Sequence, residues 1–141
     1  MSAVAVIMRM EYTLETIHNK AFWEALDILV AGSQVIVDRP KGSTHPRFPS
    51  LVYPLDYGYL KGTTAMDGGG IDIWRGSLPQ PSVDAIICTV DLMKKDSEIK
   101  ILIGCTPEEM RLASEFHNQG EVMKGMLIMR GKVAMSPSLL R

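Results

Sequence analysis

Apolar residues recur at helical spacing near the start of the chain. Between positions 18 and 30, Phe22, Ala25, Leu26 and Leu29 fall at i, i+3, i+4 and i+7. This spacing predicts an amphipathic helix that buries the face formed by these four residues.

A second helix is predicted from Thr106 to about Gln119. Thr106 can cap its N-terminus, Pro107 suits the first helical position, and Glu109 completes a capping box. The apolar face of this helix is predicted to comprise Met110, Ala113 and either Phe116 or His117. His117 is expected to be a partly exposed residue at the helix end.

Short β-branched or alternating runs, bounded by Gly, Pro and Asp, predict several strands between and after these helices. They cover residues 35–38, 51–60, 71–76, 85–92, 100–105 and 126–130, with a turn at 94–98. Strands outnumber helices, so we expect a mainly β, α+β fold: a small antiparallel β-barrel with flanking helices. Residues 1–141 form one domain, with 1–10 and 132–141 as flexible ends.

Composition narrows the class of protein. Hydrophobic residues make up 46% and charged residues 22% of the 141, which is typical of a globular domain, and the net charge of −1 argues against nucleic-acid binding. The apolar start is too short to cross a membrane. Cys88 and Cys105 lack metal-site spacing and are predicted to be buried free thiols. We therefore expect a soluble cytoplasmic protein that binds neither nucleic acid nor membrane.

Residues that could bind a ligand or a metal are most concentrated in residues 53–72. This segment combines three tyrosines, one lysine, three consecutive glycines and several aspartates. Gly68–Gly70 can bend the chain, so Asp67 and Asp72 could approach one divalent cation from two directions. A glycine hairpin with two surface aspartates is the simpler interpretation, and both remain open.

Two further groups of residues extend this picture. Asp91 and Asp96 repeat the five-residue spacing and precede Lys100. Upstream, one short loop carries four potentially cationic side chains, which are Arg39, Lys41, His45 and Arg47. This loop is either simply solvated or a clamp for a phosphate-bearing ligand.

The order of these motifs resembles that of the soluble (family I) inorganic pyrophosphatases. The shared features are Tyr53-Pro54-Leu55-Asp56-Tyr57-Gly58-Tyr59, then Asp67 through Asp72, then Asp91, Asp96 and Lys100-Ile101-Leu102-Ile103. Upstream, Asp38-Arg39-Pro40-Lys41-Gly42-Ser43 and Arg47-Phe48 match at the same interval. The resemblance covers about half of the chain.

The resemblance implies an OB-like barrel whose mouth holds Mg²⁺, and hydrolysis of pyrophosphate to two phosphates by a metal-activated water. Metal ligands would be Asp67, Asp72, Asp91 and Asp96, with Asp38 as an outer acidic residue. Arg47, Tyr57 and Lys100 would bind the phosphates. It also implies a homo-oligomer.

The sequence departs from the family pattern at the catalytic base, because Gly69 stands where the family has an aspartate. Asp56 is the nearest carboxylate in the motif that could substitute, so the candidate catalytic residues are Asp72, Asp56 and Tyr57. A phosphate-binding arginine is also missing, and Arg39 or Lys41 could compensate. The main alternative is a non-catalytic or weakly active Mg–phosphate or nucleotide-binding module. An OB-type nucleic-acid binder is a third interpretation, but the net charge of −1 argues against it.

Overall fold

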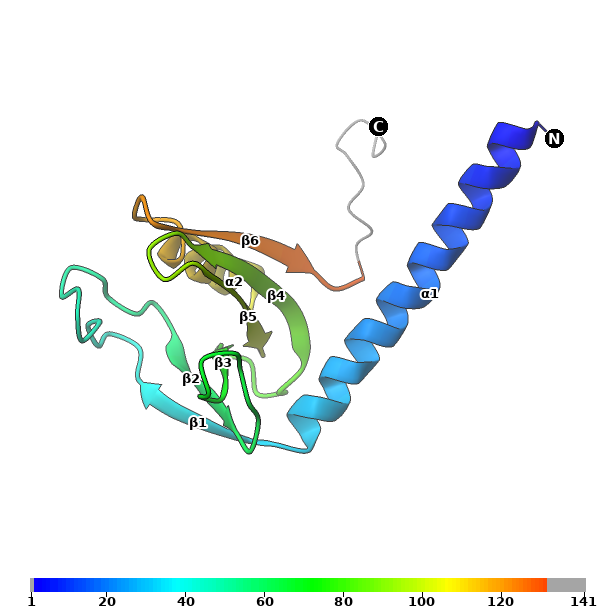
Figure 1. Cartoon of the computed structure of the whole chain (residues 1–141). Coiled ribbons are helices and arrows are strands. Elements are labelled where there is room, and N and C mark those ends of the chain that lie inside the picture. The colour runs from blue at the N-terminus through cyan, green and yellow to red at the C-terminus, as the bar shows by residue number, and fades with distance from the viewer. Residues whose placement is uncertain (1, 132–141) are drawn as a thin grey trace.

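The computed structural model describes residues 2–131, with side chains at 2–7 and 19–131. In chain order the elements are α1 (Ala3–Ala31), β1 (Gln34–Arg39), β2 (Asp56–Lys61), β3 (Ile71–Arg75), β4 (Val83–Asp91), β5 (Asp96–Ile103), α2 (Pro107–Phe116) and β6 (Met123–Met129). Figure 1 shows a curved sheet with a helix on either side. The predicted α+β class is confirmed, while the predicted tail at 132–141 lies outside the described residues.

The six strands form one sheet in the order β1-β2-β3-β5-β4-β6. The β4–β5 hairpin inserts β5 beside β3, and these two strands run parallel, whereas the other neighbours are antiparallel. β1 and β6 are the end strands of the described sheet. The sheet is therefore open and mixed instead of the closed antiparallel barrel that we predicted.

Alternation along the central strands produces two separate hydrophobic cores. Ile101 and Ile103 of β5 pack with α1, whereas Leu102, which lies between them, packs with α2. The α2-side core contains Trp74, which is fully buried. The two faces of the sheet are thus covered by different helices, and functional residues must emerge where this cover ends.

α1 is longer than predicted. It begins at Ala3, where the Ser2 hydroxyl accepts a hydrogen bond from the Ala5 amide, so residues 3–10 are part of the helix. Its last third lies against the sheet and its N-terminal part extends beyond it (Figure 1). Arg130 of the segment after β6 makes two hydrogen bonds of 2.7 Å to the carboxylate of Asp27, which ties this part of α1 down.

The face of α1 that contacts the sheet differs from the predicted one. Trp23, Leu26 and Val30 are buried, whereas Phe22 and Ala25 are exposed. The contact face is therefore turned by one residue from the predicted face, a difference that helical spacing alone did not resolve. Among the described residues, no helix is long and apolar enough to cross a membrane.

α2 agrees with its prediction at the start and differs at the end. Thr106 and Glu109 form the predicted capping box, and Met110, Ala113 and Phe116 are buried. The helix ends at Phe116, three residues earlier than predicted, and His117 is its C-cap residue.

The cysteines are both free, as predicted. Cys105 is buried, and burial raises the pKa of its thiol to about 12, so it remains protonated at neutral pH. Cys88 is only partly buried, which corrects half of the prediction. The geometry gives neither thiol a part in the chemistry below.

Two strand boundaries matter for the site. β2 begins at Asp56, and the residues from 51 to 55 form a loop that nevertheless buries Tyr53 and Leu55. β5 begins at Asp96, so Asp96 and Glu98, which were predicted to lie in a turn, are strand residues.

Candidate functional site

Three residues that are distant in the sequence meet on the α2 side of the sheet. The Asp72 Oδ2 atom accepts a hydrogen bond of 2.6 Å from the Tyr57 hydroxyl and one of 2.8 Å from Lys100 Nζ. Lys100 Nζ also donates to Glu98 Oε2 at 2.5 Å. β2, β3 and β5 supply these side chains as neighbours in the sheet. We call the part of the sheet that carries Tyr57, Asp72, Glu98 and Lys100 the site face.

Lys100 is the positive centre of the site face, and its side chain is only 5% exposed. Burial lowers the pKa of Lys100, but the charges and hydrogen bonds of Asp72 and Glu98 outweigh this effect, so its pKa lies above the usual value. The pKa of Tyr57 lies well above its usual value because of burial and the nearby Asp72 carboxylate. Lys100 is therefore a permanent cation and Tyr57 a neutral hydrogen-bond donor at physiological pH.

Glu98 was missed as a candidate by sequence reasoning. The sequence could have identified it, because Glu98 lies two residues before Lys100 and residues at this spacing in a strand share one face. The predicted turn at 94–98 concealed this spacing. With Glu98 included, the carboxylates of Asp72 and Glu98 both contact the Lys100 ammonium, so these three side chains together carry a net charge of −1.

The acidic character of the site face continues along the β4–β5 hairpin. Antiparallel pairing places Asp96 opposite Asp91, Glu98 opposite Thr89 and Lys100 opposite Ile87. Directly opposed residues of an antiparallel pair share a face. Asp91 and Asp96 therefore lie on the same side as Glu98 and Lys100, towards the turn end of the hairpin.

The predicted metal ligands do not form a ready cluster. Asp91 Oδ1 accepts hydrogen bonds from the amides of Met93 and Lys94, at 2.9 and 3.0 Å, and Asp67 Oδ1 accepts one from the Gly69 amide at 2.9 Å. Among the described residues, no three His, Cys, Asp or Glu side chains are placed to hold one metal ion. The shared approach of Asp67 and Asp72 to a single cation stays a prediction.

The donor chemistry of the site face nonetheless fits Mg²⁺. Asp72, Asp91, Asp96 and Glu98 present carboxylate oxygens on one face, and hard divalent cations prefer such ligands while retaining several waters. One or two protein carboxylates are enough for Mg²⁺ when a phosphate ligand supplies the remaining oxygens. Cation binding here would require the carboxylates to reorient around it.

The glycine run has a different explanation at each position. Only Gly68 has a positive φ, of 85°. A Cβ at Gly70 would lie 2.8 Å from both the Leu60 carbonyl oxygen and a ring carbon of Tyr59, so this glycine permits a close approach. At Gly69, the nearest atom to an added Cβ is Asp67 Oδ1, at 3.4 Å. A side chain is therefore sterically allowed at Gly69, where the family pattern has its aspartate.

The end of β1 places a cation, Arg39, at one edge of the site face, so this residue belongs to a strand and not to the predicted loop. Arg39 Nη1 donates to the Tyr53 hydroxyl, and its guanidinium carbon lies 5.6 and 5.9 Å from the ring centroids of Tyr53 and Tyr57. Tyr53 in turn packs on Tyr57, with ring centroids 5.3 Å apart. Arg39 thus reaches the same tyrosine that contacts Asp72.

The remaining predicted residues of this region lie further out. Asp56 Oδ1 accepts a hydrogen bond of 2.8 Å from the Lys41 amide, so this candidate base holds the loop in place. The Lys41 and Arg47 side chains are exposed, as is Asp38. None of these three makes a side-chain hydrogen bond to Asp72, Glu98 or Lys100 among the described contacts.

His117 lies beneath the site face and is only 5% exposed, so the prediction of a partly exposed histidine was wrong. Its Nε2 atom accepts a hydrogen bond of 2.9 Å from the Trp74 indole N–H. Burial and the nearby Lys100 charge lower the pKa of His117 to about 3. It is a neutral residue that supports Tyr57, whose ring centroid lies 6.5 Å away.

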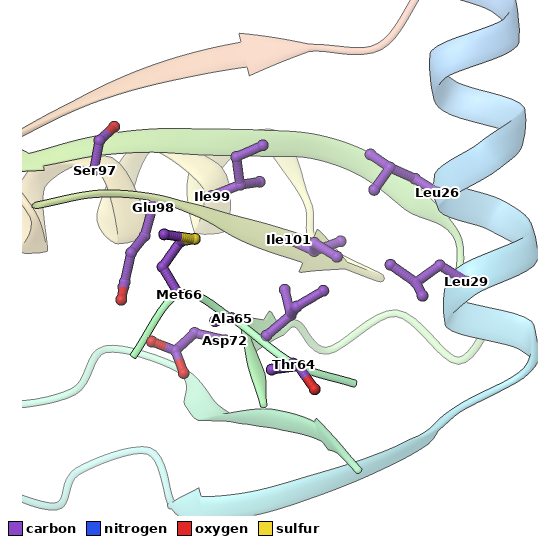
Figure 2. Close-up of a pocket in the computed structure, with 11 residues that line it drawn as sticks. Leu26, Leu29, Thr64, Ala65, Met66, Asp72, Ser97, Glu98, Ile99 and Ile101 are labelled. Carbon is purple, nitrogen blue, oxygen red and sulfur yellow. The ribbon is translucent and has the colours of Figure 1, made fainter. Parts of the chain in front are cut away.

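A pocket of about 400 Å³ opens beside Asp72 and Glu98 (Figure 2). Its other walls come from α1, from the loop before β3, from the start of β3 and from β5, and they are apolar except at Thr64 and Ser97. Leu26, Leu29, Met66, Ile99 and Ile101 are labelled among them in Figure 2. Two carboxylates therefore border a cavity with an otherwise largely apolar lining.

The fold has counterparts among solved structures. An inorganic pyrophosphatase from Coxiella burnetii matches with a TM-score of 0.52 and 17% identity, over 68% of this chain and 84% of the other. An inorganic phosphatase from Anaplasma phagocytophilum matches with a TM-score of 0.47 and 13% identity, over 67% and 81%. No protein-family model and no curated protein matches the sequence. The likeness to the Coxiella protein shows that this chain has the inorganic-pyrophosphatase fold.

Proposed function

We propose that this protein binds inorganic pyrophosphate together with Mg²⁺ at the site face and hydrolyses it to two phosphates. The observation that carries the proposal is the convergence of Tyr57, Asp72 and Lys100 in one hydrogen-bonded group. The sequence motifs had already identified all three residues as candidates. The fold match to the Coxiella pyrophosphatase agrees with the fold that the resemblance implied.

The charge distribution favours an anion bound together with a metal over an anion alone. Asp72 and Glu98 outweigh Lys100, so a free phosphate would be repelled from the centre of the site face. Arg39, the last residue of β1, lies beside this acidic region, with its guanidinium over the Tyr57 ring. A metal–pyrophosphate complex carries both kinds of charge and matches both parts.

The residues of the chain then have distinct tasks. Asp72 and Glu98, with Asp91 and Asp96 further along the hairpin, would hold Mg²⁺, which when bound supplies charge neutralisation and a more acidic water. Lys100 would neutralise phosphate oxygens on which charge develops as the anhydride bond breaks. The Tyr57 hydroxyl donates a hydrogen bond to Asp72 and thereby fixes the orientation of that carboxylate.

The alternative function is a binding module with weak or no turnover, and Gly69 is the observation that favours it. A glycine supplies no base, and a positioned general base contributes a rate factor of about 10²–10⁴. The protein would then bind the metal–pyrophosphate complex and release it unchanged.

Phosphate release from pyrophosphate, measured with and without Mg²⁺, distinguishes the two functions when it is combined with calorimetric binding. Mg²⁺-dependent release is the result that we expect. Binding of Mg²⁺–pyrophosphate without release would support the binding module instead. Neither binding nor release would refute both.

A further inference from the structure

β3 and β5 pair along only part of their length. Their parallel register begins at Ile73 and Ile101, although β3 already starts at Ile71 and β5 at Asp96. The leading residues of both strands keep their other partners, since β3 pairs with β2 and β5 pairs with β4. The described sheet therefore lacks pairing between the starts of β3 and β5, and the pocket of Figure 2 takes its lining from both strands there.

Alternation along these two strands gives the pocket two chemically different ends. Successive strand residues face opposite sides of a sheet. Ile71 and Ile101 belong to the core on the α1 side, whereas Asp72 and Glu98 belong to the site face on the other side. Where the strands are unpaired, residues of both sides line the same pocket. Figure 2 shows the leucine side chains of α1 at one end of it and the two carboxylates at the other.

The apolar walls of the pocket are only partly covered by the rest of the protein. Ile99 and Met66 both line it, and they are 40% and 94% exposed. Covering such side chains with an apolar group is favourable, and a methionine adapts its shape to the group that it meets. The volume of about 400 Å³ is typical of sites that hold small organic molecules.

The carboxylate end of the pocket carries an excess of negative charge. Asp72 and Glu98 share the single ammonium of Lys100, and their side chains are 32% and 18% exposed. The described hydrogen bonds use Oδ2 of Asp72 and Oε2 of Glu98, and none of them involves Oδ1 or Oε1. A cationic group that reaches this end from the pocket would therefore meet carboxylate oxygens that lack a described donor.

We propose that this pocket binds a small amphipathic organic cation, with its apolar body between α1 and β5 and its ammonium group against Asp72 and Glu98. A neutral ligand of the same shape would leave the excess negative charge unmatched, and an anionic one would be repelled. The inference goes beyond the proposed function, because the ligand contains no phosphate and its binding needs neither metal nor turnover.

Three probes of similar shape test the requirement for a cation, namely phenethylammonium, phenethyl alcohol and phenylpropionate. Each is titrated into the full chain in metal-free buffer and followed by calorimetry and by methyl NMR. We expect phenethylammonium to bind at least tenfold more tightly than the alcohol, and phenylpropionate not to bind measurably. The bound aromatic ring should shift the methyl resonances of Leu26 and Ile101, which line the pocket.

Two variants test the two ends of the pocket separately. Glu98→Gln removes one charge but keeps an oxygen that can accept from Lys100, and Ile99→Thr reduces the apolar wall at an exposed strand position. The matched controls are Glu121→Gln and Val90→Thr, which change exposed residues that do not line the pocket. The Kd of phenethylammonium should rise about tenfold in Glu98→Gln and about threefold or more in Ile99→Thr, and should not change in the controls.

The expected pattern contains a further internal check. Glu98→Gln should leave the affinity for phenethyl alcohol nearly unchanged, whereas Ile99→Thr should weaken the binding of both ligands. Absence of phenethylammonium binding, equal affinities for the ammonium and the alcohol, or equal Kd values in wild type and Glu98→Gln would overturn the proposal. None of these outcomes depends on whether the protein hydrolyses pyrophosphate.

Discussion

At the scale of single residues, Asp72 is the centre of the site because it joins a neutral donor and a buried cation. Tyr57 and Lys100 both contact its Oδ2 atom, which leaves Oδ1 free of protein donors among the described contacts. That free oxygen is the position from which Asp72 could contact a metal ion. Its geometry depends on two neighbours, and it is therefore well defined before any ligand arrives.

Gly69 is the residue at which a substitution should increase activity. Gly69→Asp restores the carboxylate of the family pattern at a position with space for a Cβ, so we predict that phosphate release rises at least tenfold. Gly70→Asp is the matched control, because its Cβ would clash with the Leu60 carbonyl. A folded Gly69→Asp protein that is no faster than wild type would show that the missing base does not limit the reaction.

His117 should make stability depend on pH. Its pKa is about 3 in the folded protein and near 6.5 when unfolded, so the unfolded chain binds more protons between these values. Stability is therefore retained above about pH 6.5 and falls as the pH decreases, by about 1.4 kcal/mol per unit. His117→Gln keeps an acceptor for Trp74 without this titration.

Denaturant unfolding of both proteins from pH 7 to pH 4.5 measures the effect. The stability difference between wild type and His117→Gln should change steadily in favour of the variant as the pH falls. Parallel pH profiles would contradict a buried neutral histidine.

At the scale of elements, the β4–β5 hairpin determines which acidic residues belong to the site. Its four-residue turn spans residues 92–95, and β5 then carries Asp96, Glu98 and Lys100 on one face. This hairpin supplies the acidic part of the site face, and its turn carries Lys94. Insertion of β5 next to β3 brings Lys100 to Asp72.

Local sequence patterns predicted the ends and faces of single elements better than the contacts between elements. The capping box at Thr106 and the α2 face were predictable because capping and helical spacing are local. The contact between Lys100 and Asp72 follows from a parallel pairing between distant segments, which local patterns do not reveal. The turn end was misplaced because Asp96 and Ser97 are common turn residues, and this concealed Glu98.

The observed orientation of α1 can be tested with two neighbouring aromatic residues, one buried and one exposed. Trp23 is 7% exposed and Phe22 is 42% exposed. We predict that Trp23→Ala lowers the free energy of unfolding by about 3 kcal/mol or more, and Phe22→Ala by about 1 kcal/mol or less. Urea denaturation of the two variants tests this, and equal losses would contradict the observed orientation of the helix.

At the scale of the whole molecule, charges of opposite sign lie next to each other around the site face. Carboxylates of β3 and the β4–β5 hairpin form the acidic part, and Arg39 at the end of β1 lies beside it, over the Tyr57 ring. Such a surface suits a ligand that contains both a metal cation and an anion. The overall net charge of −1 gave no indication of this separation.

Self-association is a further prediction at this scale. Val4, Val6 and Ile7 of α1 are 66%, 42% and 54% exposed, and Met126 on the end strand β6 is 62% exposed. Apolar side chains in such positions favour association, and two open sheet edges add further contacts. Light scattering should give a mass that is a multiple of 15.6 kDa. A monomer at micromolar concentration would contradict the prediction.

The central claim is that the group around Asp72 acts on pyrophosphate. Its most direct test compares Mg²⁺-dependent phosphate release by wild type, Asp72→Asn and Glu24→Gln, where Glu24 is an exposed α1 carboxylate paired with Lys20. Removing a charge that acts in the transition state typically lowers kcat by about 10²–10³. We predict such a loss for Asp72→Asn and none for Glu24→Gln. Equal rates in all three proteins would contradict the claim.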